Sequence, residues 1–172
     1  MFELKREWGD HKIFSFNTSS NKFFEYFQGL FDTQGLDMLH LKSSDYDTAK
    51  DRLGMGYLND RDTDLHKVFY GDIKANDTFK TLYCNFIKEI HDGFFPDEKY
   101  LIYQSFPSIR IQFMESKVIP PHKDSDHLSN HPLGEKNFIL PVTDMRGTNS
   151  VYIESMPDKE DFESVELSYG DL

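Results

Sequence analysis

The order of the elements that the sequence predicts is typical of an α+β chain whose strands close into a jelly-roll-like barrel. Two helical segments come first, over residues 21–31 and 78–91, and a run of short strands follows Pro96. A chain of 172 residues has the length of one domain and can bury its own hydrophobic core. We therefore expect a single domain over residues 1–172, in which 1–98 forms mainly helices and supporting loops and 99–172 forms the barrel core.

The segment 78–91 is the clearest helix, because its apolar residues recur at helical spacing on one stripe. The stripe consists of Phe79, Leu82, Tyr83, Phe86, Ile87 and Ile90. Asn76 or Asp77 is suited to cap its start, and Gly93 to a left-handed stop beyond its end. Residues 21–31 show a shorter version of the pattern, with Ser20 as the expected N-cap. We expect the longer helix to pack its stripe against a sheet.

Residues rich in β-branched and aromatic side chains alternate with turn residues after Pro96. The expected strands are 100–105, 108–114, 137–142, 150–154 and 164–167. Proline and glycine residues separate them, including the pair at 120–121. Barrels built from such strands hold metals and small ligands in their mouths.

Composition excludes several classes of function. The formal net charge of −11 argues against nucleic acid as the main partner. Cys84 is the only cysteine, so no intrachain disulfide can form, and we expect it to be a small buried apolar residue. Residues 1–7 carry charges where a signal peptide needs an apolar run, and no segment approaches the ~20 apolar residues of a membrane span. These features predict a cytoplasmic protein without a membrane partner, whose core is built from its sixteen Phe and nine Tyr.

His122 and Asp124 form the most informative pair in the chain. Side chains two residues apart lie on the same face of an extended strand, so an imidazole and a carboxylate at this spacing can bind one divalent metal. They would supply two thirds of the 2-His-1-carboxylate triad that non-haem Fe(II) oxygenases use. The pattern also fits a solvated pair in a loop.

The surrounding residues resemble a known family. The matching blocks occur in order at 107–112, 122–126, 134–144, 147–155 and 169–172. In this part the chain resembles the 2-oxoglutarate/Fe(II) dioxygenases of the streptomycin-biosynthesis hydroxylase-like group. The resemblance implies a double-stranded β-helix (a jelly-roll or cupin-like barrel) that binds Fe(II) and 2-oxoglutarate, with His122 and Asp124 as metal ligands and catalytic residues. Such an enzyme oxidises a small polar metabolite with O₂ while 2-oxoglutarate decarboxylates to succinate and CO₂.

In that family a Gly-Asp turn like Gly170-Asp171 precedes the strand that leads to a distal His ligand, and a basic residue beyond it pairs with 2-oxoglutarate. Both would follow Leu172, where the sequence given ends. We therefore expect either a fragment of a longer polypeptide or a chain that has lost its last strands. In the second case the protein would be a catalytically incompetent barrel remnant that acts as a binding or structural module.

Further candidates complete the predicted site. Arg110 shares one strand face with Gln112 and could meet the carboxylates of 2-oxoglutarate, or it could face solvent. Asn137 leads an apolar strand, and the family pattern makes it a second cofactor-binding candidate. His127 and His131 could supply the third ligand by curling back over the metal, or they could belong to a solvated loop. The oligomeric state and the substrate are left open by the sequence.

Overall fold

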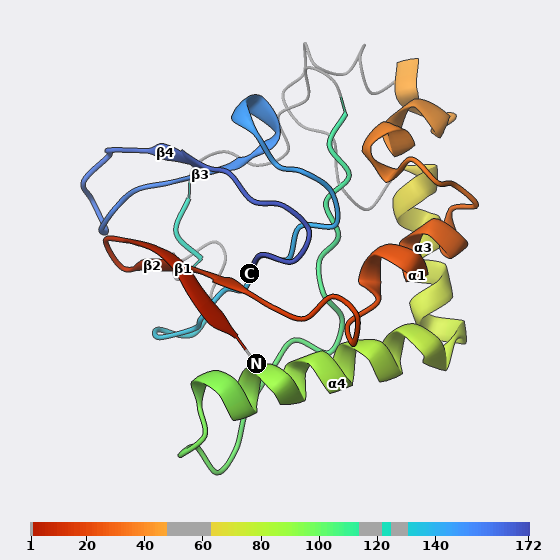
Figure 1. Ribbon diagram of the computed structural model, residues 1–172. Helices are drawn as coiled ribbons and strands as arrows, with labels where there is room; N and C mark the ends of the chain where they lie inside the picture. The colour runs from red at the N-terminus through yellow and green to blue at the C-terminus, as the bar shows by residue number, and fades with distance from the viewer. Residues whose placement is uncertain (1, 48–62, 114–121, 125–130) are drawn as a thin grey trace.

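The computed structural model describes residues 2–47, 63–113, 122–124 and 131–172 (Figure 1). The helices gather on one side of the molecule and the short strands on the other, with helix α4 running along the base (Figure 1). The chain is therefore a mixed α+β protein, as expected. Within the described ranges the strands form antiparallel pairs and isolated bridges rather than a closed barrel.

The chain begins with a β-hairpin that the sequence analysis did not predict. Strand β1 (Glu3–Trp8) pairs antiparallel with β2 (His11–Ser15). Gly9 makes the turn at φ +56°, where a Cβ atom would lie only 2.0 Å from the backbone oxygen of Ser155. A side chain at position 9 is therefore excluded both by its backbone conformation and by the close approach of the loop around residue 155.

Strand β2 continues into contact with the other end of the described chain. The backbone N–H of Phe14 donates to Leu172 O at 2.9 Å, and Leu172 N–H donates back to Phe14 O at 2.8 Å. Lys5 adds an ion pair with the buried Asp171 carboxylate at 2.5 Å. Gly170 makes the turn before this pairing at φ +104°. The first and last described segments therefore lie side by side.

The two strands of the second pair lie at positions where strands were predicted, although their pairing was not. Strand β3 (Val151–Ile153) pairs antiparallel with β4 (Glu163–Val165), within or overlapping the expected ranges 150–154 and 164–167. Beyond it, Met145 and Leu167 exchange two backbone hydrogen bonds of 2.8 and 3.1 Å. A short 3-10 helix, η3 (Gly147–Asn149), leads into β3.

The other expected strands are wrong within the described residues. Segments 100–105, 108–113 and 137–142 form no ladder there, although their composition favours β structure. A strand is stabilised by hydrogen bonds to a neighbouring strand, so composition alone does not form one. Ile102 shows the result, because its side chain is 97% exposed where a strand in a core would bury it.

The described helices are α1 (Phe23–Leu30), η1 (Leu36–Lys42), α3 (Asp64–Ala75) and α4 (Asp77–Phe94). Asn76 caps α4 as predicted, because its side-chain oxygen accepts the Thr78 N–H at 2.9 Å. The expected Ser20 cap of α1 is wrong, since Ser20 Oγ instead donates to Asn17 O at 3.1 Å. Helix α3 was not predicted; it is capped by Thr63, whose oxygen accepts the His66 N–H.

The sequence predicted that Gly93 would lie beyond the end of helix α4, but the helix continues through it. It ends at Phe94, two residues before Pro96, in keeping with the clash between a proline ring and a helical residue before it. Gly93 instead makes room for Phe2, because a Cβ atom there would lie 2.8 Å from the Phe2 ring. The glycine therefore serves packing between the N-terminus and α4.

The core consists largely of aromatic rings, as composition predicted. Buried Phe side chains from α1, α3 and α4 contact one another, with Phe69 and Phe79 centroids 5.2 Å apart in an edge-to-face arrangement. Phe86 of α4 meets Phe16, just beyond β2, at 5.1 Å. The stripe of α4 therefore packs against α1, α3 and the N-terminal hairpin region. Cys84 lies beside this stripe and is exposed, so its expected burial is wrong.

Candidate functional site

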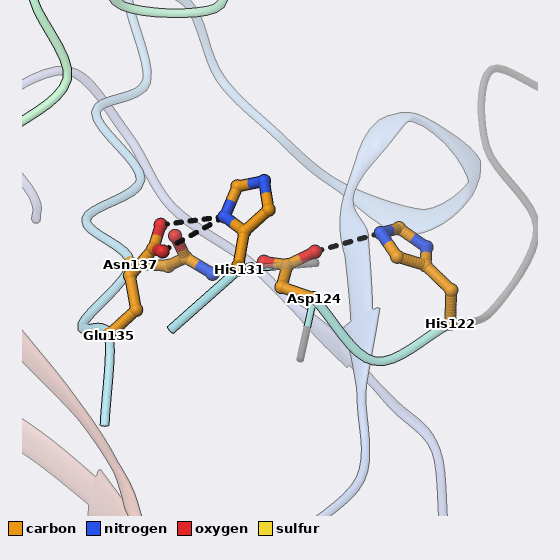
Figure 2. A network of polar contacts seen from close by, with 5 residues as sticks. All are labelled: His122, Asp124, His131, Glu135 and Asn137. Atoms are coloured by element: carbon orange, nitrogen blue, oxygen red, sulfur yellow. Dashed lines mark hydrogen bonds and ion pairs between the residues drawn. The ribbon is translucent and has the colours of Figure 1, made fainter. Parts of the chain in front are cut away.

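His122 and Asp124 lie in a turn rather than at the end of a strand. Their side chains nevertheless meet, because His122 Nε2 donates to Asp124 Oδ1 at 2.9 Å (Figure 2). Both side chains are only partly exposed, at 35% and 37%. The predicted convergence of the two groups is present, although it arises from the turn and not from strand alternation.

Asp124 is held from a second direction by residues that follow it in sequence. Its Oδ2 accepts a hydrogen bond from the Asn137 side-chain amide, and its backbone oxygen accepts the His131 N–H at 3.1 Å. Figure 2 shows the Asp124 carboxylate between the His122 ring and the Asn137 amide. The structure therefore joins three of the four predicted site residues through one carboxylate.

His131 turns its ring towards Glu135 (Figure 2). Its Nδ1 lies 2.9 and 3.0 Å from the two carboxylate oxygens of Glu135. Glu135 follows His131 by four residues. The hydrogen bond and charge of Glu135 raise the pKa of His131, and the negative charge of Asp124 raises it further. Glu135 was missed by the sequence analysis, although a His and a Glu four residues apart are a visible signal.

Lys123, between the two predicted ligands, ties the turn to a distant loop. Its Nζ donates to Asp158 Oδ1 at 2.5 Å, and this hydrogen bond to the carboxylate raises the pKa of Lys123. The Glu154 carboxylate accepts the backbone N–H groups of Asp158 at 3.0 Å and Glu160 at 2.9 Å. The loop after β3 is thereby held beside the His122–Asp124 turn.

Arg110 lies in the extended segment that leads away from α4. Burial lowers the pKa of its guanidinium group. In the described ranges no hydrogen bond joins Arg110 to His122, Asp124 or Asn137, so its assignment to the same site stays a prediction. His127 falls outside the described residues.

The separation of His122 Nε2 and Asp124 Oδ1 fits a shared metal ion. Two neighbouring ligands of an octahedral ion with bonds of about 2.1 Å lie about 3.0 Å apart. The observed 2.9 Å is close to this separation, but it is a hydrogen bond in which Nε2 points at Oδ1, so a shared metal would require the two side chains to turn towards it. No group of three or more His, Cys, Asp or Glu side chains placed to hold a metal occurs within the described part of the chain.

A second polar cluster surrounds the start of α3. His66 is 2% exposed, its Nδ1 lies 2.5 Å from Thr63 Oγ1, and its Nε2 is buried without a hydrogen-bond partner among the described residues. Burial lowers the pKa of His66 to about 4, against a smaller opposing effect of the Asp64 charge. Asp64 itself accepts from Ser43 and Ser44, which joins η1 to α3. No partner for His66 was predicted, because its burial depends on contacts between segments that are far apart in the chain.

Comparison with known proteins yields no relative: no family model, curated protein or solved structure matches the chain. No helix in the part of the chain that the structure describes has the length and apolar character needed to cross a membrane. The argument for function therefore depends on the residues of the His122–Asp124 site.

Proposed function

We propose that the chain forms the core of a non-haem Fe(II)/2-oxoglutarate-dependent dioxygenase that oxidises a small polar metabolite. The observation that carries the proposal is the 2.9 Å approach of His122 Nε2 to Asp124 Oδ1. This hydrogen bond brings together an imidazole and a carboxylate, the two kinds of side chain that non-haem Fe(II) oxygenases use as ligands. The resemblance of residues 107–172 to the dioxygenase family supports the choice of iron and 2-oxoglutarate over another metal.

In this function His122 and Asp124 would hold the iron, and the bound iron would supply the chemistry by which O₂ and 2-oxoglutarate are converted while a C–H bond of the substrate is oxidised. Asn137 and His131 fix the orientation of Asp124. Arg110 is the proposed partner of a 2-oxoglutarate carboxylate, because a guanidinium group can bind a carboxylate with two parallel hydrogen bonds. Among the described residues no third side chain joins His122 and Asp124 in a group that could hold a metal.

The proposed architecture is a double-stranded β-helix. The antiparallel pairs β1–β2 and β3–β4, together with the bridges at Met145–Leu167 and Ser15–Asp171, are compatible with parts of such a barrel. We place the protein in the cytoplasm, where a lone cysteine and an Fe(II) cofactor both suit the reducing conditions.

The test is formation of the ternary complex without oxygen. Fe(II) and 2-oxoglutarate added anaerobically to the protein should give a weak visible charge-transfer band. His122→Ala and Asp124→Asn should lose the band, whereas His40→Ala, which changes a histidine of η1, should keep it. Arg110→Met should raise the 2-oxoglutarate concentration needed for half of the signal.

The same experiment separates the enzyme from the alternative of a binding module. If the folded protein gives no band at saturating Fe(II) and 2-oxoglutarate, the dioxygenase proposal is wrong and the incompetent barrel remnant is favoured. A band of equal strength in wild type and His122→Ala would also contradict the proposed site.

A further inference from the structure

An apolar segment, residues 100–106, lies on the protein surface after helix α4. Residues 100–109 include no charged side chain, in a chain whose net charge is −11. Four apolar side chains of the segment are exposed: Tyr100 at 77%, Ile102 at 97%, Tyr103 at 46% and Phe106 at 45%. Single exposed apolar residues are common on protein surfaces, but a group of neighbouring ones is typical of an interaction surface. We call these four side chains the apolar patch.

Contacts with α3 and α4 fix the position of this segment. The Tyr83 hydroxyl of α4 donates to Gln104 O at 2.7 Å, and the Tyr83 ring meets the Tyr103 ring edge-to-face at 6.1 Å. Beyond the patch, the Ile109 N–H donates to the Tyr70 hydroxyl of α3 at 3.3 Å. Figure 1 shows the segment, in green, running from the C-terminal end of α4 back across the molecule. A backbone that is already anchored loses less conformational freedom when its side chains bind a partner.

The backbone of the segment has further capacity for hydrogen bonds. No backbone–backbone hydrogen bond joins residues 100–106 to another residue in the described ranges. Their side chains are rich in the aromatic and β-branched types that favour strands. A segment of this kind, with exposed apolar side chains and little charge, can pair with an identical segment of another molecule.

The absence of charge favours a second copy of this chain as the partner. A charged partner would find no counterpart for its charges over residues 100–109, and burial of an unpaired charge is costly. The same patch on a second copy is apolar and uncharged, so the two patches can cover each other across a two-fold axis.

The exposed area is enough for a weak dimer. The four side chains offer roughly 500 Å² on each copy, if a fully exposed aromatic side chain has about 200 Å². The total of about 1,000 Å² for two copies lies near the lower limit of specific protein interfaces. We therefore expect dimerisation that depends strongly on protein concentration.

We propose that residues 100–106 form the interface of a weak homodimer, in which the apolar patch of one copy packs against the same patch of a second copy. The interface uses no residue of the His122–Asp124 site, so this inference is independent of the proposed dioxygenase function. Two copies of charge −11 repel each other, and salt screens this repulsion. The dimer should therefore become tighter as the salt concentration rises, whereas a dimer held by ion pairs would become weaker.

The experiment is sedimentation equilibrium of the whole chain at protein concentrations from about 1 µM to about 1 mM, where weak complexes form. Ile102→Asp places a charge in the patch at a side chain that makes little contact with the rest of the protein. Met38→Asp makes the same change at a 53% exposed side chain of η1 and is the matched control. Melting temperatures and circular dichroism establish that both variants are folded.

We expect wild type and Met38→Asp to dimerise equally, with an association constant that rises with NaCl concentration. Ile102→Asp should weaken dimerisation by about 10-fold or more, because the interface would bury two unpaired carboxylates.

Three results would contradict the proposal. Wild type that stays monomeric at the highest protein and salt concentrations would exclude the homodimer and leave the patch to a different partner. Equal dimerisation of Ile102→Asp and Met38→Asp would show that any dimer uses another surface. A dimer that dissociates as salt is added would be held by charges rather than by the apolar patch.

Discussion

The buried His66 makes the stability of this protein sensitive to mild acid. Its side chain is 2% exposed and its Nε2 has no hydrogen-bond partner among the described residues, so protonation would place a charge in the interior. Burial lowers the pKa of His66 from 6.5 to about 4 in the folded protein. The unfolded chain binds the proton more readily, so stability is lost as the pH falls from about 6.5 to about 4.

The size of the effect follows from the two pKa values. A difference of about 2.5 between them corresponds to about 3 kcal/mol, at roughly 1.4 kcal/mol for each pH unit. This loss is a large part of the 5–15 kcal/mol by which a typical domain of about this size is stable. Carboxylates such as Asp64 also lose their charge in acid, so the contribution of His66 has to be isolated by a variant.

The perturbation is His66→Leu, which removes the titrating group and fills the same buried space. Urea unfolding at pH 7, 6, 5 and 4, followed by circular dichroism, gives the free energy of unfolding of both proteins. The advantage of the variant should grow by about 3 kcal/mol between pH 7 and pH 4. His40→Leu controls for the loss of a histidine as such. Parallel pH profiles of wild type and His66→Leu would refute the reasoning.

Three further predictions concern packing and capping, and each is measured by urea unfolding at pH 7. Phe69→Ala should cost about 3–5 kcal/mol because the ring is 1% exposed, whereas Val68→Ala, at a 46% exposed neighbour, should cost much less. Asn76→Ala should cost about 1 kcal/mol through loss of the α4 cap, and an unchanged stability would show that the cap contributes nothing. Gly71→Ala should raise the free energy of unfolding by about 0.5–1 kcal/mol, because open space surrounds this helical position. Gly93→Ala should raise it less or lower it, because the new Cβ atom would meet the Phe2 ring. Equal increases for the two variants would contradict the Phe2 contact.

Some contacts of the candidate site could be predicted from residue spacing in the sequence, and others could not. The two-residue separation of His122 and Asp124 made their approach foreseeable, and the structure gives it through a turn. Asn137 was predicted at the site, but its hydrogen bond to Asp124 was not. Glu135 was missed because its contact with His131 depends on the turn between them. Local spacing can suggest partners, but their geometry depends on how the backbone folds.

The strands differ in how well the sequence predicts them. The positions of β3 and β4 could be predicted because both strands are rich in β-prone residues. The pairing of β2 with residues 170–172 could not be predicted, because β1 and β2 are largely charged or partly exposed and the partner lies at the other end of the chain. Segments 100–105 and 137–142 have β-prone composition and form no described ladder.

Local sequence patterns were enough to predict helix α4, its Asn76 cap, the aromatic character of the core and the spacing of His122 and Asp124. These features depend on residues within a few turns of one another, or on composition alone. Four other features come from folding of the whole chain: Phe2 packs against Gly93, Cys84 is exposed, His66 is buried with no partner for Nε2 among the described residues, and Asn137 binds Asp124. Each of these depends on contacts between segments whose meeting is set by packing of the whole chain.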